Sequence, residues 1–169
     1  LPFMGEIPLH TDRNEQTSLL KRIIGKFALH KKRQTDEHTI VVENGKRDVM
    51  NEAFRVLRTN LEFMAGKDKT SNVILLTSFN PGSGKTFLTM NIAVSLALKH
   101  KKVLVIDGDL RKASTSAYVG SPKKGLSNYL SGGVDDVKSL IVPFKEYDNL
   151  RILPVGTIPP NPTELLYEE

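Results

Sequence analysis

The sequence predicts an α/β domain in which helices flank a parallel sheet, and three observations indicate it. Residues 73–76 and 103–106 are uninterrupted apolar runs, the composition of parallel strands that are covered on both faces. Between them lie a glycine-containing loop and an Ala- and Leu-rich segment, so the order is strand, loop, helix, strand. A further candidate strand, residues 150–155, follows a short helix that is closed by glycines. This alternation favours a parallel sheet.

Length and composition fit one folded domain with a substantial core. The chain has 169 residues, of which 39% are apolar and 25% are charged. No apolar run approaches the roughly 18 residues of a membrane-spanning helix, and the chain starts with neither an initiator methionine nor a signal peptide. We therefore expect a piece that is cut at both ends. The absence of cysteine excludes disulfides and thiolate metal sites and is compatible with the cytoplasm.

The loop at residues 77–86, Thr-Ser-Phe-Asn-Pro-Gly-Ser-Gly-Lys-Thr, has the composition of a phosphate-binding loop. Glycines let backbone N–H groups turn toward a phosphate, and the following helix adds the positive end of its dipole. Lys85 would reach the β- and γ-phosphates, and the Thr86 hydroxyl would bind Mg²⁺. Phe79 stands where the strict pattern has glycine, so an ordinary helix-capping turn is the alternative. The nucleotide-binding candidates are Pro81, Gly82, Ser83, Gly84, Lys85, Thr86 and Phe87.

Two acidic residues, Asp107 and Asp109, follow the second apolar run, where a parallel strand presents its carboxyl end to ligands. With Thr86 nearby they could bind Mg²⁺ directly or through water, or one could accept a proton from an attacking hydroxyl. Arg111 could meet phosphate charge. An Asp-Gly-Asp turn is also a common loop composition, but its position one β-α-β unit after the glycine loop favours catalysis. The catalytic candidates are Lys85, Asp107, Asp109 and Arg111.

Residues 48–64 carry the spacing of an amphipathic helix. Their apolar residues recur at intervals of four, three, four and three, which is one face of a helix. On another stripe Glu52, Arg55 and Arg58 are three apart and should line up in one row. The row could form intrahelical salt bridges on a wet surface, worth about a few tenths of a kcal/mol. Alternatively it could face a partner, because arginine forks bind carboxylates across interfaces.

Residues 1–45 are predicted to be an arm that builds no core, and residues 46–169 the folded domain. Six basic residues and no acidic one lie in residues 21–33, and they contribute to a net charge of +5. Such a run can be a solvated flexible arm, or it can attract anionic headgroups by about 1 kcal/mol per basic residue near a membrane. It lacks a pattern of aromatic residues interleaved with the charges, so we expect no nucleic-acid partner.

Together these motifs resemble the bacterial tyrosine kinases of the Wzc-like polysaccharide co-polymerase type, relatives of the MinD/ParA P-loop ATPases. Residues 78–86 are similar to that family's Walker A form, which also lacks the first glycine, and residues 105–111 to its Walker A′ motif, Asp-x-Asp-x-Arg after a strand. Glu52, Arg55 and Arg58 match its oligomerisation motif, Glu-x-x-Arg-x-x-Arg. MinD/ParA proteins carry a signature lysine where this chain has Asn80, which argues against that sister group.

The resemblance implies a P-loop NTPase fold of the MinD/ParA type that uses ATP and Mg²⁺. It implies tyrosine phosphorylation between subunits of a homo-oligomeric ring, in control of capsular or exopolysaccharide chain length and export. It places the protein at the cytoplasmic face of the bacterial inner membrane, with the export machinery and a tyrosine phosphatase as partners. The family's Walker B aspartate and tyrosine-rich tail are expected beyond Glu169, so we expect an incomplete domain with little activity alone.

Two other functions fit the same residues. An ATPase switch of the MinD/ParA sort would hydrolyse ATP to control dimerisation and would phosphorylate nothing. A non-enzymatic assembly module of an export complex would bind ATP and form rings, and its role in polymer export would not depend on Lys85.

Overall fold

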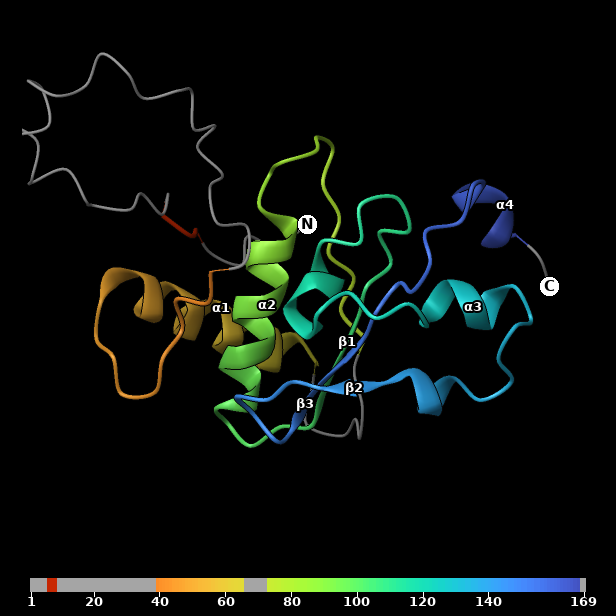
Figure 1. Cartoon of the computed structure of the whole chain (residues 1–169). Coiled ribbons are helices and arrows are strands. Elements are labelled where there is room, and N and C mark those ends of the chain that lie inside the picture. Colours follow the sequence, from red (N-terminus) through yellow and green to blue (C-terminus); the bar gives the residue numbers. More distant parts are fainter. Residues whose placement is uncertain (1–5, 9–38, 66–72, 168–169) are drawn as a thin grey trace, which may run out of the picture.

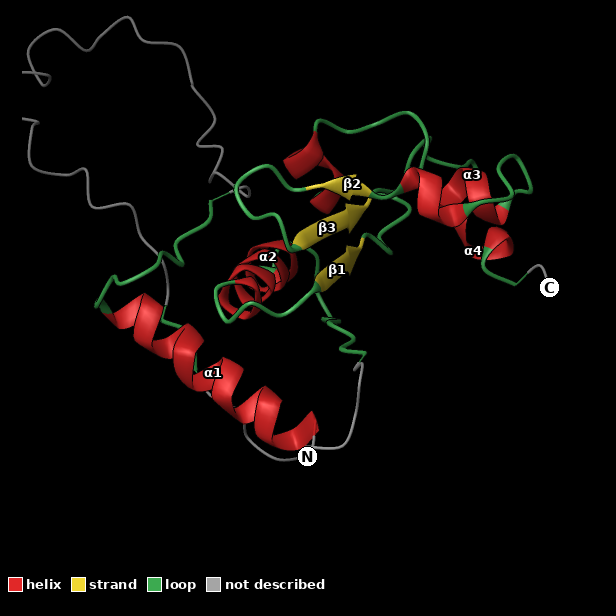
Figure 2. Cartoon of the chain, turned by 90° about the horizontal axis from the view of Figure 1, so that it is seen from below, coloured by secondary structure: helices red, strands yellow, loops and turns green. Residues whose placement is uncertain are grey.

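The structure, a computed structural model, describes residues 6–8, 39–65 and 73–167. Figure 1 and Figure 2 show a layered arrangement in which helix α2 packs on a small sheet and helix α1 packs on the outside of α2. The elements, in which η marks a 3-10 helix, are α1 (Val49–Ala65), α2 (Lys85–Ala97), β1 (Val103–Ile106), η1 (Thr115–Val119), α3 (Leu126–Leu130), η2 (Val137–Leu140), β2 (Val142–Pro143), β3 (Leu150–Leu153) and α4 (Pro162–Leu165).

The sheet has the strand order β1-β3-β2 and is mixed, not parallel throughout as predicted. β1 runs parallel to β3, with Val105 opposite Ile152, whereas β2 runs antiparallel to β3. The antiparallel pair follows from a tight turn, in which the Tyr147 N–H donates to the Phe144 carbonyl at 3.1 Å. A connection that short can only reverse the chain, since a parallel crossover needs a dozen or more residues.

The apolar run before the glycine loop is not a strand, which contradicts the prediction. Val73 and Leu75 are 99% and 86% exposed. β1 pairs with β3 on one edge, and no strand in the described residues pairs with its other edge or with residues 73–77. A strand forms only where a neighbour takes up its backbone hydrogen bonds, and an apolar run does not supply that neighbour.

Helix α1 confirms the spacing argument, since it covers Val49–Ala65 and buries Phe54 and Leu57. Asp48 stands just before it, and its carboxylate accepts a hydrogen bond from the Asn51 N–H at 2.8 Å. This is the bond by which an N-capping side chain satisfies an unpaired N–H of the first turn. Hydrogen bonds from the Asn51 backbone and side chain lower the pKa of Asp48.

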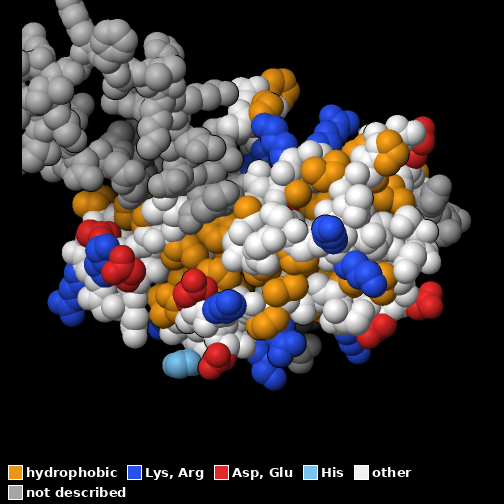
Figure 3. Space-filling view, in the orientation of Figure 1, with side chains coloured by type: hydrophobic (Ala, Val, Ile, Leu, Met, Phe, Trp, Pro, Cys, Tyr) orange, Lys and Arg blue, Asp and Glu red, His pale blue; other side chains and the backbone are white. Residues whose placement is uncertain are grey.

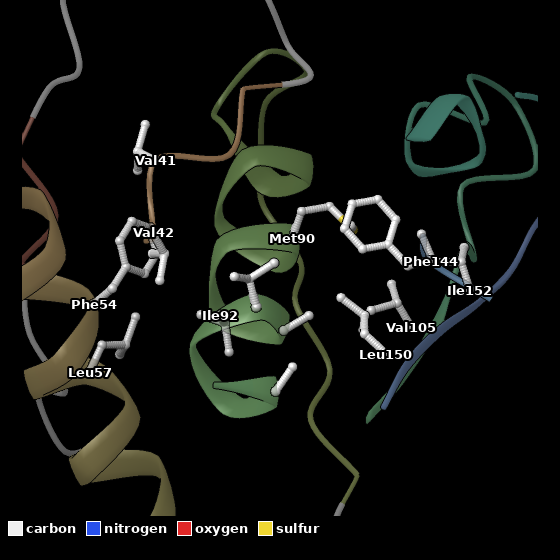
Figure 4. Close-up of a cluster of buried hydrophobic side chains, with 13 residues drawn as sticks. Val41, Val42, Phe54, Leu57, Met90, Ile92, Val105, Phe144, Leu150 and Ile152 are labelled. Carbon is white, nitrogen blue, oxygen red and sulfur yellow. The ribbon is translucent and has the colours of Figure 1, made fainter. Parts of the chain in front are cut away.

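Helix α2 is the centre of the core. Figure 4 shows apolar side chains on both of its sides, from α1 and residues 41–42 on one side and from the sheet on the other. A helix between two layers is apolar nearly all round, and Met90 and Val94 are accordingly buried completely. Ser95 faces α1, because its hydroxyl and its carbonyl accept hydrogen bonds from Arg58 of that helix.

Residues 39–43 form a strap between α1 and α2. The backbone N–H groups of Val41 and Val42 donate to Oδ1 of Asn91 at 2.8 and 3.1 Å, and Asn51 Nδ2 donates to the Val41 carbonyl at 3.1 Å. Val41 and Val42 are buried in the core cluster, which Ile7 also touches. The prediction that residues 1–45 build no core is therefore wrong here. The buried side-chain amides of Asn51 and Asn91 bind the backbone of this strap, as a neighbouring strand would do in a sheet.

Candidate nucleotide-binding site

The glycine loop and the acidic loop lie at the same end of the molecule. Residues 98–102 are a short connection from the end of α2 to the start of β1, so the helix and the strand run in opposite directions. The start of α2 and the carboxyl end of β1 are thus at one end, at the top of Figure 1. Figure 3 shows Lys and Arg side chains there, as it does on other parts of this face. The helix N-terminus at this end suits an anionic ligand.

The two glycines of the loop before α2 face open space. Gly82 and Gly84 have φ angles of 75° and 83°, left-handed values that glycine adopts without steric cost. No atom lies within 4 Å of the position that a Cβ of either glycine would take. Since α2 is 13 residues long and begins directly after Gly84, its first N–H groups and the positive end of its dipole lie at this loop.

Lys85 is held at the loop by local contacts. Its ammonium donates to the Ser78 hydroxyl at 2.8 Å. The Ser83 hydroxyl lies 2.8 Å from the same oxygen and also donates to the Asn80 carbonyl. An ammonium has three N–H donors, and within the described residues only the bond to Ser78 uses one. Lys85 can therefore bind phosphate oxygens without breaking a salt bridge.

The neighbouring candidates in the loop differ in what they offer to a ligand. The half-buried Thr86 has a hydroxyl that makes no hydrogen bond to any described residue, so it is available to a metal ion. Phe87 packs its ring on Phe54, with the centroids 6.0 Å apart, so its side chain belongs to the core and not to a nucleotide pocket. Pro81 is exposed at the tip of the loop.

Asp107 is only 3% exposed and is held on both oxygens. Its Oδ2 accepts hydrogen bonds from the N–H and the hydroxyl of Ser116, each at 2.7 Å, and its Oδ1 accepts a longer one from the Asp109 N–H at 3.3 Å. Burial raises the pKa of the Asp107 carboxyl, and the hydrogen bonds from Ser116 act in the opposite direction. Sequence reasoning missed Ser116, because no motif links it to the aspartates.

Asp109 and Arg111 are more accessible. Oδ1 of Asp109 accepts from the backbone N–H groups of Arg111 and Lys112, at 3.3 and 3.1 Å, and so shapes the turn after β1. The exposed Arg111 lines a groove of about 550 Å³ with residues 158–164. The acidic loop thus offers one buried carboxylate, one accessible carboxylate and a cation beside a groove.

The three residues of the predicted row do not share one environment. Glu52 and Arg55 are exposed and form a salt bridge of 2.8 Å. Arg58 is 9% exposed, and its Nη1 donates to the Ser95 carbonyl and hydroxyl at 2.8 and 3.1 Å. Each step of three residues falls about 60° short of a full turn, so the row drifts around the helix until Arg58 faces α2.

The donor set fits Mg²⁺ bound together with a triphosphate. Among the described residues no three His, Asp or Glu side chains converge on a point that could hold a metal ion. Mg²⁺ needs no such cage, since it keeps several waters and binds one or two carboxylates together with phosphate oxygens. Asp107, Asp109 and the Thr86 hydroxyl are oxygen donors of the right kind. The basic run at residues 21–33 lies outside the described residues.

Comparison with known proteins shows the family of the domain that carries these loops. Residues 74–161 match the family model of the CobQ/CobB/MinD/ParA nucleotide binding domain. The tyrosine-protein kinase wzc of Salmonella typhimurium is 41% identical over 72% of this chain, and the tyrosine-protein kinase etk of Escherichia coli K12 is 33% identical over 96%. These matches cover 17% and 22% of the two relatives, so the chain spans about a fifth of their length.

A solved structure of the BceF tyrosine kinase domain is similar over nearly the whole chain. The TM-score is 0.73 at 31% sequence identity, and the match covers 99% of this chain and 62% of that one. The family model also confirms the predicted P-loop NTPase class of the fold. The chain therefore belongs to the CobQ/CobB/MinD/ParA nucleotide-binding family, and its relatives include bacterial tyrosine kinases of the Wzc and Etk type.

Proposed function

We propose that this chain is part of a protein-tyrosine kinase that transfers the γ-phosphoryl group of ATP to a tyrosine hydroxyl. One observation carries the proposal: a glycine loop with a lysine ammonium lies at the same end of the sheet as a carboxylate pair. The names of the relatives, tyrosine-protein kinases in several bacteria, support the choice of tyrosine as acceptor.

In this proposal the protein acts mainly by positioning groups and neutralising charge, as is general in phosphoryl transfer. Lys85 and the N–H groups of the glycine loop hold the β- and γ-phosphates. The Thr86 hydroxyl and an aspartate hold Mg²⁺, which neutralises charge on the phosphate oxygens when it is bound. Arg111, which lines the groove, would meet phosphate charge.

The environments of the two aspartates suggest different roles. Asp107 is buried and has one oxygen fixed by Ser116, which suits a rigid metal ligand. Asp109 is partly exposed, and its Oδ1 alone accepts hydrogen bonds from the part of the backbone that the structure describes. We therefore assign to Asp109 the acceptance of the proton from an incoming tyrosine hydroxyl, because an acceptor that arrives from solvent must reach its base.

A phosphorylation assay tests the proposal. The chain, and a form extended at its C-terminus to the full length of the BceF kinase domain, are incubated with γ-labelled ATP, Mg²⁺ and a tyrosine-containing polypeptide. We expect label on tyrosine with the extended form and about 10²–10³-fold slower labelling with its Lys85→Met variant. Release of labelled phosphate without labelled tyrosine would instead support an ATPase switch.

We further propose that the kinase controls the chain length and export of a capsular or extracellular polysaccharide, together with the export machinery and a tyrosine phosphatase. This proposal of a role in polysaccharide export rests on the resemblance of the motifs to those of Wzc-like proteins. A cell that expresses the protein with the Lys85→Met substitution should then make polymer of altered length. Wild-type polymer in that cell would favour a non-enzymatic assembly module that only binds nucleotide.

Assembly into a ring is proposed through the exposed side of α1, where Glu52 and Arg55 lie.

A membrane contact is proposed for the basic run at residues 21–33 on the cytoplasmic face of the inner membrane. Within the described ranges no helix combines the length and hydrophobicity needed to cross a bilayer. Vesicles with anionic lipid should bind the chain more weakly as salt rises. Equal binding to neutral vesicles would contradict the membrane proposal.

A further inference from the structure

We propose that Ser116 is a positioning residue that orients the Asp107 carboxylate toward the metal-binding side of the site. The inference rests on the proposed function, in which Asp107 binds Mg²⁺ beside the triphosphate. It adds a residue that lies outside the glycine loop and outside the Asp-x-Asp-x-Arg motif.

Ser116 grips one oxygen of the carboxylate with two donors. Its N–H and its hydroxyl both lie 2.7 Å from Oδ2 of Asp107, and Ser116 is 2% exposed. Two donors from one residue fix the rotation of the carboxylate as well as its position. Among the described residues, the other oxygen, Oδ1, accepts only the 3.3 Å hydrogen bond from the Asp109 N–H, so it is the oxygen left for a metal ion.

The direction of the Ser116 hydroxyl proton is set from a third segment. The Val155 N–H, just beyond β3, donates to the Ser116 Oγ at 2.8 Å. A hydroxyl has one proton and two lone pairs, so an oxygen that accepts from Val155 directs its proton to Asp107. The order of donation is therefore Val155 to Ser116 to Asp107.

Val155 itself is immobilised by contacts with the segment that begins α3. The Leu126 and Ser127 N–H groups donate to the carbonyls of Pro154 and Val155 at 2.8 and 2.9 Å. A Cβ on Gly125 would lie 2.2 Å from the Pro154 oxygen, so the two backbones are in direct contact. Residues 125–127 and 154–156 thus form a close crossing of two chain segments, and Ser116 connects Asp107 to this crossing.

The alternative is that Ser116 only satisfies a buried carboxylate and contributes to stability. Ser127 offers a matched control for that role. It is equally buried, at 3% exposure, and its hydroxyl donates to the Thr157 carbonyl at 2.5 Å in the same crossing, with no contact to Asp107. Loss of either hydroxyl should reduce stability, but only loss of Ser116 should change metal binding.

The test compares Ser116→Ala, Ser116→Thr and Ser127→Ala with the parent chain. Binding of a non-hydrolysable ATP analogue is measured by calorimetry in EDTA, Mn²⁺ affinity of the analogue complex by electron paramagnetic resonance, and unfolding by circular dichroism. We expect Ser116→Ala to weaken Mn²⁺ binding about 10-fold, the lower end for outer-shell partners. Analogue binding in EDTA should be unchanged, Ser116→Thr should restore Mn²⁺ affinity, and Ser127→Ala should bind Mn²⁺ like the parent.

Equal Mn²⁺ affinity in Ser116→Ala and the parent would overturn the positioning role and leave the proposed function intact. A parent chain that binds neither the analogue nor Mn²⁺ would overturn both. If Ser116→Ala does not fold, Ser116→Cys replaces it, because a thiol keeps most of the volume and is a weaker donor. An intermediate Mn²⁺ affinity of the cysteine variant would support the proposal, and parental affinity would refute it.

Discussion

The two halves of the candidate site are stabilised in different ways. In the glycine loop the hydrogen bonds of Ser78, Ser83 and Lys85 span at most seven residues, and most of the loop is exposed. In the acidic loop Asp107 is buried, and its partner Ser116 is bonded to Val155, which lies 39 residues further along the chain. One half is a local structure, whereas the other is assembled by the tertiary fold.

This difference predicts two kinds of defect. Changes in the glycine loop should remove ligand contacts and leave the fold intact, because few native contacts depend on the loop. Changes around the acidic loop should alter stability and chemistry together, because the same hydrogen bonds serve both. The following substitutions test the comparison, from the largest expected effect to the smallest.

Lys85→Met should lower phosphoryl transfer by the extended form by about 10²–10³-fold, the usual cost of removing one donor to transition-state charge. The unfolding temperature should stay within about 1 °C, because the ammonium makes one bond to Ser78 within its own loop. Labelled-ATP assays and thermal circular dichroism measure the two effects. Lys99→Met, at the exposed far end of α2, is the control. A large loss of stability in Lys85→Met would show that the glycine loop is not independent.

Gly125→Ala should destabilise the fold by about 3 kcal/mol, since its Cβ would lie 2.2 Å from the Pro154 oxygen and 2.4 Å from the Gly156 nitrogen. Gly132→Ala is the matched control: its φ is +69°, but nothing lies within 4 Å, so about 1 kcal/mol of backbone strain is expected. Urea denaturation gives both values. Equal losses would mean that the crossing behind Asp107 can move apart without cost.

Arg58→Ala should cost about 2 kcal/mol, because it leaves the buried Ser95 carbonyl and hydroxyl without their donor. Arg55→Ala removes an exposed pair with Glu52 and should cost less than about 0.5 kcal/mol. Denaturation of both variants measures stability, and sedimentation measures oligomer size. Together they distinguish a role of Arg58 in joining α1 to α2 from a role in assembly. Unchanged stability with a smaller oligomer in Arg58→Ala would contradict the role of Arg58 in joining the two helices.

Asp107→Asn should raise the unfolding temperature of the metal-free chain at pH 7. Burial raises the pKa of Asp107 above the 3.8 of the unfolded chain, so folding opposes its ionisation. The resulting loss of folding free energy is fully present above the pKa of the folded state and disappears as the pH falls toward 3.8. Asparagine does not ionise, so the variant lacks this loss at every pH. Thermal scans in EDTA should therefore show a gain that shrinks as the pH is lowered from 7 to 4. A gain that grows on acidification would contradict the raised pKa.

Prediction from sequence worked where a structure depends on nearby residues. The spacing of apolar residues located α1, and the run Val103–Ile106 is strand β1 as expected. It failed where a remote neighbour decides the outcome. Residues 73–76 had the composition of a strand but find no pairing strand among the described residues. Arg58 had the spacing of one row with Glu52 and Arg55 but is bonded to Ser95 of α2 instead.

The site divides in the same way. Order along the chain was enough to place Lys85 and the two aspartates at one end of the sheet, because a short connection between a helix and a strand allows no other direction. It could not reveal that Val41 and Val42 bond to Asn91, or that Ser116 holds Asp107.

The sequence by itself determined the local geometry of this protein: the helices, the glycine turn and the order of the charged groups. These follow from backbone preferences and from the period of the hydrophobic pattern, which act over a few residues. Only the tertiary structure decided which side chains are buried and paired, because burial and hydrogen bonding depend on segments that meet far apart in sequence. Arg58 and Asp107 have their roles for that reason.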